Sequence, residues 1–170
     1  MRRPNWLSVL SLSMFGLVAS GHLAGCSSSK TCTLLGCESS ATMRVYAAVD
    51  RTAMTTATIT ACRNGSCSAG QPTTVPSAPG DRLAFRLAGP IAAEGYLSSP
   101  DPVKGYKIEA VFALEGVTTA NGDTYEIRVT PAGAAAPAVT VSDKATYQST
   151  QPNGPDCPPE CTAATIDKTL

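Results

Sequence analysis

From Thr42 to the C-terminus, apolar and polar residues alternate with a period of two in a series of short runs. Such a run turns one set of side chains toward a core and the other toward solvent, which is the pattern of a half-buried strand. The apolar sets are Met43, Val45, Ala47 and Val49; Ala57, Ile59 and Ala61; Leu83, Phe85 and Leu87; Tyr106, Ile108, Ala110, Phe112 and Leu114; Tyr125, Ile127 and Val129; and Val139 and Val141. Further strands are expected at 145–149 and 163–168. No stretch of about 12 residues shows the period of a helix.

Turn-favouring residues separate these runs, at positions 64–65, 76–81, 98–102, 121–123 and 152–155. Glycine, proline, asparagine, aspartate and serine each favour turns for known conformational reasons. Seven to eight short strands therefore predict an all-β fold, an antiparallel β-sandwich covering residues 41–170 with immunoglobulin-like or transthyretin-like topology. A small barrel is the alternative.

One hairpin is predicted at the level of single residues. Asn64-Gly65 fits a two-residue turn in which both residues have positive φ, closed by Arg63 and Ser66. Cys62 and Cys67 then lie opposite each other in a non-hydrogen-bonded pair, with Cα atoms about 4.5 Å apart. That separation suits a disulfide, so Cys62–Cys67 is the pairing with the best support.

The N-terminus has a different pattern. A basic head, Met1-Arg2-Arg3, precedes an uncharged and mostly apolar stretch of 14 residues at positions 6–19, and Leu23-Ala24-Gly25-Cys26 follows. This is the three-part layout of a secretory signal peptide over residues 1–25. A membrane-spanning helix needs about 20 apolar residues, so a permanent transmembrane anchor is the weaker interpretation.

Leu23-Ala24-Gly25-Cys26 resembles the lipobox of bacterial lipoproteins. The resemblance implies cleavage before Cys26, lipidation of its thiol with acyl chains such as palmitate, and a lipidated tether over residues 26–40. Ser27, where an aspartate would retain the protein at the inner membrane, implies transfer to the outer membrane in a Gram-negative host. An ordinary signal peptide with an incidental cysteine is the alternative. The segments 60–67 and 152–157 also resemble small Cys-containing envelope lipoproteins, which implies no particular activity.

Seven cysteines are an odd count for an exported protein, and lipid on Cys26 leaves six. An oxidising compartment favours disulfides among them. Besides Cys62–Cys67, sequence proximity suggests Cys32–Cys37 and Cys157–Cys161, although Cys37 reaching across to Cys161 is the open alternative. The spacings lack the C-x2-C pattern of zinc sites, so no metal site is expected.

Cleavage before Cys26 also changes the composition. It removes the only histidine, His22, and the only tryptophan, Trp6. Catalytic triads that use histidine and histidine-ligated metals are then excluded from the mature chain. Removal of Arg2 and Arg3 leaves 11 basic against 13 acidic residues, without a basic patch, so nucleic-acid binding is not expected.

The remaining polar residues suggest structural roles. Glu109 and Glu115 share one strand face but lie about 20 Å apart, too far to work together on one glycosidic bond. If Phe112 pairs with Tyr125, Glu109 lies opposite Arg128 in a surface ion pair.

Loop and aromatic residues add little chemistry. Three aspartates in predicted loops are expected to form turns, namely Asp101, Asp123 and Asp156. Tyr46 and Tyr96 are the exposed aromatic candidates for a sugar-binding platform.

These observations predict a lipid-anchored, non-catalytic cell-envelope β-sandwich with a structural or partner-recognition role. No catalytic, cofactor-binding or metal-binding residue is expected, and the partners are the membrane, through Cys26, and an envelope protein or glycan. The alternative is an extracytoplasmic ligand- or carbohydrate-binding module, and a third class is a hydrolase that uses distant carboxylates brought together by folding.

Overall fold

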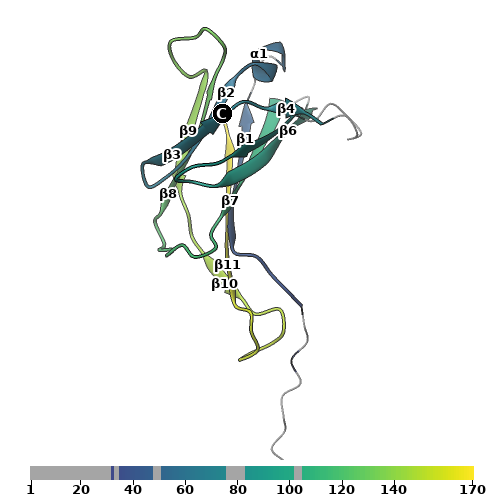
Figure 1. Ribbon diagram of the computed structural model, residues 1–170, viewed down its shortest axis with the longest axis vertical. Coiled ribbons are helices and arrows are strands. Elements are labelled where there is room, and N and C mark those ends of the chain that lie inside the picture. Colours follow the sequence, from purple (N-terminus) through teal and green to yellow (C-terminus); the bar gives the residue numbers. More distant parts are fainter. Residues whose placement is uncertain (1–31, 33–34, 48–50, 76–82, 102–104) are drawn as a thin grey trace, which may run out of the picture. The chain divides into compact units, whose positions relative to one another are not determined.

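The computed structural model describes residue 32 and residues 35–47, 51–75, 83–101 and 105–170, which contain eleven strands and one short helix. Figure 1 shows these elements along the chain. In chain order they are β1 (Ser40–Ala47), α1 (Arg51–Thr55), β2 (Thr58–Arg63), β3 (Ser66–Gly70), β4 (Thr73–Thr74), β5 (Leu83–Leu87), β6 (Ala93–Asp101), β7 (Gly105–Ala113), β8 (Thr124–Thr130), β9 (Val139–Lys144), β10 (Gln148–Thr150) and β11 (Cys161–Thr169).

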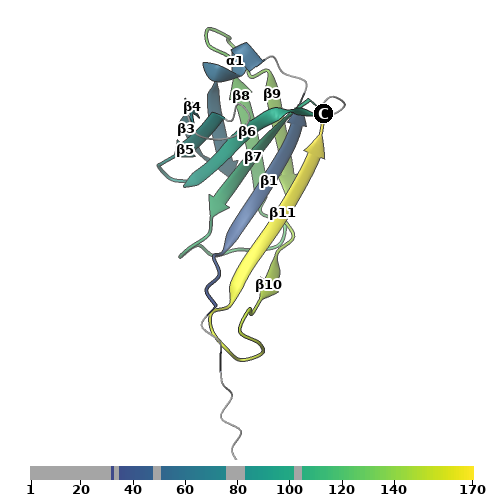
Figure 2. The same cartoon turned by 90° about the vertical axis from the view of Figure 1, so that its right-hand side faces the viewer.

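The strands form two sheets. The larger has the order β10-β11-β1-β7-β6-β5-β4, and the smaller has the order β3-β2-β8-β9. Figure 2 shows β1 and β11 side by side in the larger sheet, with β8 and β9 of the smaller sheet behind it. β1 runs parallel to β11, with Ser40 opposite Ala163, and antiparallel to β7 on its other side. The first and last strands of the described chain are therefore neighbours.

The apolar sides of the two sheets supply one core. The alternation predicted from the sequence is confirmed in β1, β2, β5, β7, β8 and β9. In these strands the predicted apolar residues are buried and the residues between them are more exposed. Phe112 of the larger sheet meets Tyr125 of the smaller sheet edge to face, with ring centroids 4.7 Å apart. Such pairs add to the energy of burial. Tyr106, at the predicted core end of β7, is only half-buried.

The all-β class is confirmed, and the two sheets are consistent with the expected sandwich. The expectations that all strands pair antiparallel and that they number seven to eight are wrong. The larger sheet is mixed, because β1 and β11 run parallel, and the described residues contain eleven strands. The segment 98–102, predicted as a turn, belongs for the most part to β6. Proline has low strand propensity, but pairing with β7, which continues from Ser98 to Asp101 across a shift in register, overrides it.

Gly95 explains why the alternation of apolar and polar residues does not predict β6. It lies between Phe85 of β5 and Ala110 of β7 in the register of the sheet. A Cβ atom at this position would lie 1.9 Å from the carbonyl oxygen of Glu109 and 2.6 Å from Cζ of Phe85. Glycine is therefore required here by close packing, and it interrupts the alternation that marks the other strands.

The predicted hairpin between β2 and β3 is confirmed. Asn64 and Gly65 have φ values of 49° and 81°, as the two-residue turn requires. Cys62 and Cys67 are register partners and form a disulfide, with Cα atoms 4.0 Å apart. Local sequence was sufficient for this feature because turn type sets hairpin register.

Candidate functional site

Two disulfides join the N-terminal part of the described chain to its C-terminal part. Cys32 is bonded to Cys157, and Cys37 is bonded to Cys161, the first residue of β11. The pairings Cys32–Cys37 and Cys157–Cys161, expected from proximity, are therefore wrong. The open alternative that joined Cys37 to Cys161 is the correct one. The reason is topological: because β1 and β11 are parallel neighbours, the segments that lead into them lie side by side.

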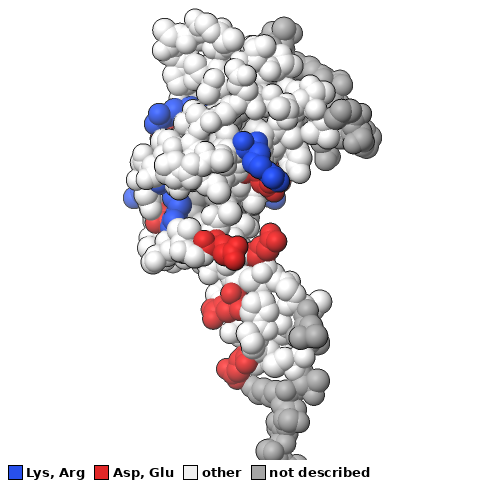
Figure 3. Space-filling model, viewed as in Figure 1, with Lys and Arg blue, Asp and Glu red and all other residues white. Residues whose placement is uncertain are grey.

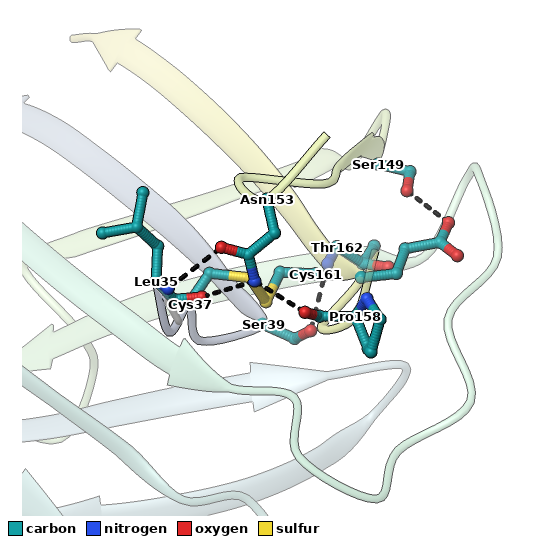
Figure 4. The surroundings of a disulfide bond; sticks show 9 residues. Leu35, Cys37, Ser39, Ser149, Asn153, Pro158, Cys161 and Thr162 are labelled. Atoms are coloured by element: carbon teal, nitrogen blue, oxygen red, sulfur yellow. Dashed lines mark hydrogen bonds between the residues drawn. A yellow bond between two sulfur atoms is a disulfide. The ribbon is translucent and has the colours of Figure 1, made fainter. Parts of the chain in front are cut away.

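Hydrogen bonds reinforce this connection, as Figure 4 shows around the Cys37–Cys161 bond. Asn153 accepts from the backbone N–H of Leu35 at 2.9 Å and donates to the carbonyls of Leu35 and Pro158 at 3.0 and 2.6 Å. The backbone N–H of Thr162 donates to Oγ of Ser39 at 3.0 Å. We call these crosslinked residues, residue 32 with segments 35–39 and 153–162, the base of the domain.

A groove of about 820 Å³ lies between the base and the adjoining end of the larger sheet. Its walls come from the segments before β1 and β11, from the turn between β5 and β6, and from the end of β7. The lining residues are Cys37, Glu38, Ser39, Ser40, Arg86, Leu87, Ala88, Gly89, Ala92, Ala93, Glu94, Val111, Ala113, Glu115, Pro159, Glu160 and Cys161. Its volume lies in the range of ligand-binding pockets, about 300–1,000 Å³.

Small apolar residues and carboxylates dominate the groove. Alanine, valine, leucine and proline side chains alternate with four exposed glutamates: Glu38, Glu94, Glu115 and Glu160. Arg86 is the only cation among the lining residues, and it pairs with Glu94 at 3.0 Å. In Figure 3, acidic side chains lie on both sides of the hollow at the right-hand edge of the molecule, and more acidic side chains follow below it.

The groove carries charge and offers no recognised catalytic group. Cys37 and Cys161 are in a disulfide and supply no thiol. The four carboxylates are exposed, so water solvates them. The arrangement suits electrostatic attraction of a cationic group better than proton transfer.

A second polar cluster lies around Asp123, just before β8. Its carboxylate accepts from Nη2 of Arg63 at 2.6 Å, Nδ2 of Asn64 at 2.8 Å, the N–H of Ala120 at 3.2 Å and the hydroxyl of Tyr147 at 2.9 Å. Burial alone would raise the pKa of Asp123, but these four donors outweigh it and hold the pKa well below its usual range. A carboxylate whose anion is stabilised by four donors is a poor base.

The same cluster continues into two tyrosines. The hydroxyls of Tyr125 and Tyr147 lie 2.6 Å apart. Burial, together with the neighbouring Tyr125 and Asp123, raises the pKa of Tyr147, and burial raises the pKa of Tyr125. Asp123 closes the expected turn, since its N–H donates to the carbonyl of Ala120 at 3.0 Å. It is also the centre of this network, which connects the β2–β3 hairpin with the segments before β8 and after β9.

A third cluster lies on the outer face of the larger sheet. Glu109 accepts from Arg44 at 3.2 Å and from Lys107 at 2.9 Å, and Arg44 lies 3.7 Å from Asp167. The expected Glu109–Arg128 pair is wrong, because β7 and β8 belong to different sheets. Arg128 pairs with Glu126 on its own strand instead.

The remaining predicted residues do not form one site. Cys26 lies outside the described residues. Asp101 is the last residue of β6, and Asp156 adopts a positive φ of 64° in the base. Tyr96 is 47% exposed, whereas Tyr46 is half-buried. Within the described ranges, no group of histidine, cysteine, aspartate or glutamate side chains is suited to hold a metal ion, and no helix is long and apolar enough to cross a membrane.

Sequence reasoning missed the groove, because its four glutamates lie at positions 38, 94, 115 and 160 and have no common motif. Comparison with known proteins gives no assignment either: no family model matches the chain, and neither a curated protein nor a solved structure is significantly similar to it.

Proposed function

We propose that this protein is a lipid-anchored cell-envelope lipoprotein whose β-sandwich domain recognises an envelope partner and does not act as an enzyme. It would be exported, cleaved before Cys26, and held by acyl chains on that cysteine, at the outer membrane if the host is Gram-negative. Residues 26–31 would form the tether, shorter than the expected 26–40, because Cys32 and Cys37 are already joined to the domain by disulfides.

The observation that carries this proposal is the disulfide-bonded base. Three disulfides, including two with sequence separations of 125 and 124, indicate an oxidising compartment outside the cytoplasm. Only five residues separate Cys26 from Cys32, the first crosslinked cysteine. An anchor at Cys26 would therefore connect almost directly to the base, where disulfides join the N-terminal and C-terminal segments of the domain.

The finer topology is part of the proposal. Immunoglobulin domains place their first two strands in the same sheet. Here β1 and β2 lie in different sheets, and β1 runs parallel to the last strand. This arrangement favours the transthyretin-like alternative.

Recognition is favoured over catalysis because the groove presents a preformed concave surface with carboxylates but no activated nucleophile. Carbohydrate-binding sites usually rely on aromatic side chains that stack on sugar rings. None of the residues that line the groove is aromatic. A protein partner is therefore the better candidate than a glycan.

Metabolic labelling with a radioactive fatty acid in the native host tests the anchor. The wild-type chain should incorporate label and sediment with membranes, whereas Cys26→Ala should lose the label and be either unprocessed or released. Ser27→Ala is the matched control and should keep label and processing. Label that persists in Cys26→Ala, or wild-type protein without label, contradicts a lipid anchor at Cys26.

A further inference from the structure

We propose that the groove binds an extended, lysine- or arginine-containing peptide segment of the envelope partner. This inference deepens the recognition role proposed above and rests on it for its cellular setting. It depends on three properties of the groove, which are its rigid walls, its apolar floor and its unbalanced charge.

The walls are preorganised. One side is the base, where Cys32–Cys157 and Cys37–Cys161 are covalent and Asn153 joins Leu35 to Pro158. The other side is the paired end of β5, β6 and β7. A groove held in this way loses little conformational entropy when a ligand binds, so an open and shallow surface is able to support useful affinity.

The floor suits an extended chain with long side chains. The small residues Ala88, Ala92, Ala93 and Ala113 leave room for a backbone to approach the sheet closely. Lysine and arginine cover apolar surface with their methylene groups while the charged end remains at the polar rim. The groove therefore matches both parts of these side chains.

Three of the groove's acids lack the cation partners that several other acids of the described chain have. Elsewhere Glu109, Asp123, Glu126, Asp143 and Asp167 each have a lysine or arginine within ion-pair distance. Among the described residues, Glu38, Glu115 and Glu160 have no such partner, and all three line the groove. A cationic segment would complement them, whereas an anionic ligand would be repelled.

The test is peptide binding to the full chain, purified from whole-cell extracts in a non-ionic detergent, so that the protein is recovered with or without a lipid anchor. The probe is a fluorescent heptapeptide of alternating alanine and lysine, with an alanine–glutamate heptapeptide of the same length for comparison. Fluorescence anisotropy at low salt should show saturable binding of the lysine peptide and none of the glutamate peptide. Binding should weaken as salt is added, because exposed charges are screened.

The decisive variant replaces Glu38, Glu115 and Glu160 by glutamine. Glutamine keeps the shape of the side chain, and its amide oxygen still accepts the hydrogen bond that Ser149 donates to Glu160. This variant should bind the lysine peptide about tenfold more weakly, since each exposed ion pair contributes modestly. The matched control, Glu109→Gln, Glu126→Gln and Asp143→Asn, changes the net charge equally outside the groove and should keep wild-type affinity.

Three results overturn the proposal: no binding by the wild type, equal binding by the groove variant, or an equal loss in the control variant, which would reveal attraction by net charge alone. Circular dichroism shows whether each variant is folded. Failure of this test leaves the lipid anchor intact, and loss of fatty-acid label leaves peptide binding intact, so the two proposals fail independently.

Discussion

Arg63 and Asp123, sixty positions apart in the chain, form an ion pair with a nitrogen–oxygen distance of 2.6 Å, and each side chain is only 10% exposed. Arg63 also donates to the carbonyl of Thr118 at 2.6 Å, while Asn64 next to it donates to the same carboxylate. The pair thus ties the β2–β3 hairpin to the loop before β8. Its burial sets it apart from the other ion pairs of the described residues, whose side chains are 20–84% exposed.

Acid should destabilise the fold through Asp123. Its carboxyl titrates near pH 4 in the unfolded chain, but its pKa is much lower in the folded protein because four donors stabilise the anion. The stabilisation is therefore complete above about pH 5 and disappears as the pH falls below about 4 toward the folded-state pKa. Urea unfolding at a series of pH values measures this loss.

The variant Asp123→Asn identifies the group responsible. Removing the charge leaves Arg63 buried without its anion, which should cost about 3 kcal/mol at neutral pH. The acid-dependent loss of stability should shrink accordingly. Asp143→Asn, which removes a more exposed partner of Lys168, is the control and should keep nearly the whole acid dependence. An unchanged acid profile in Asp123→Asn would assign the effect to other carboxylates.

The two long-range disulfides should contribute to stability in a strongly non-additive way. Both close almost the same loop, since their sequence separations are 125 and 124. In the chain-entropy account, closing a loop of this size stabilises a protein by about 4–5 kcal/mol, and the second bridge restricts the unfolded chain only slightly more. Removing either pair of cysteines by serine substitution should therefore cost far less than removing both.

Denaturant unfolding under non-reducing conditions checks this, with peptide mapping to verify that the expected sulfurs are joined. The variant Cys62→Ser, Cys67→Ser is a useful comparison, because its loop spans only five positions and should matter less than the combined long-range pair. Single-pair variants that each lose as much stability as the double variant would contradict the shared-loop argument.

Gly95→Ala should be among the most destabilising small substitutions in the chain. The added methyl group would lie 1.9 Å from a backbone oxygen, so β6 and β7 must separate to accept it. We expect a loss of about 3 kcal/mol or failure to fold. Gly36→Ala is the matched control, since no atom lies within 4 Å of the Cβ position there, and it should retain wild-type stability. Equal melting temperatures for the two variants would show that the sheet yields at this point.

The sequence predicted features that depend on neighbouring residues. Alternation along β1 or β8 indicates which side chains are buried because successive residues of a strand point to opposite faces. The Asn64-Gly65 turn predicted its own register, and with it the Cys62–Cys67 bond. Both predictions succeed because the period and the turn are local properties of the chain.

The sequence by itself therefore determined the β class, most strand faces and one disulfide. Only the tertiary structure decided that β1 runs parallel to β11, and that choice brings Cys37 to Cys161 and Glu38 to Glu160. It also decided that Asp123 meets Arg63 and that Gly95 is required by its neighbours. These relationships join residues tens of positions apart, and nothing in a local pattern encodes which distant strands become neighbours when two apolar faces pack together.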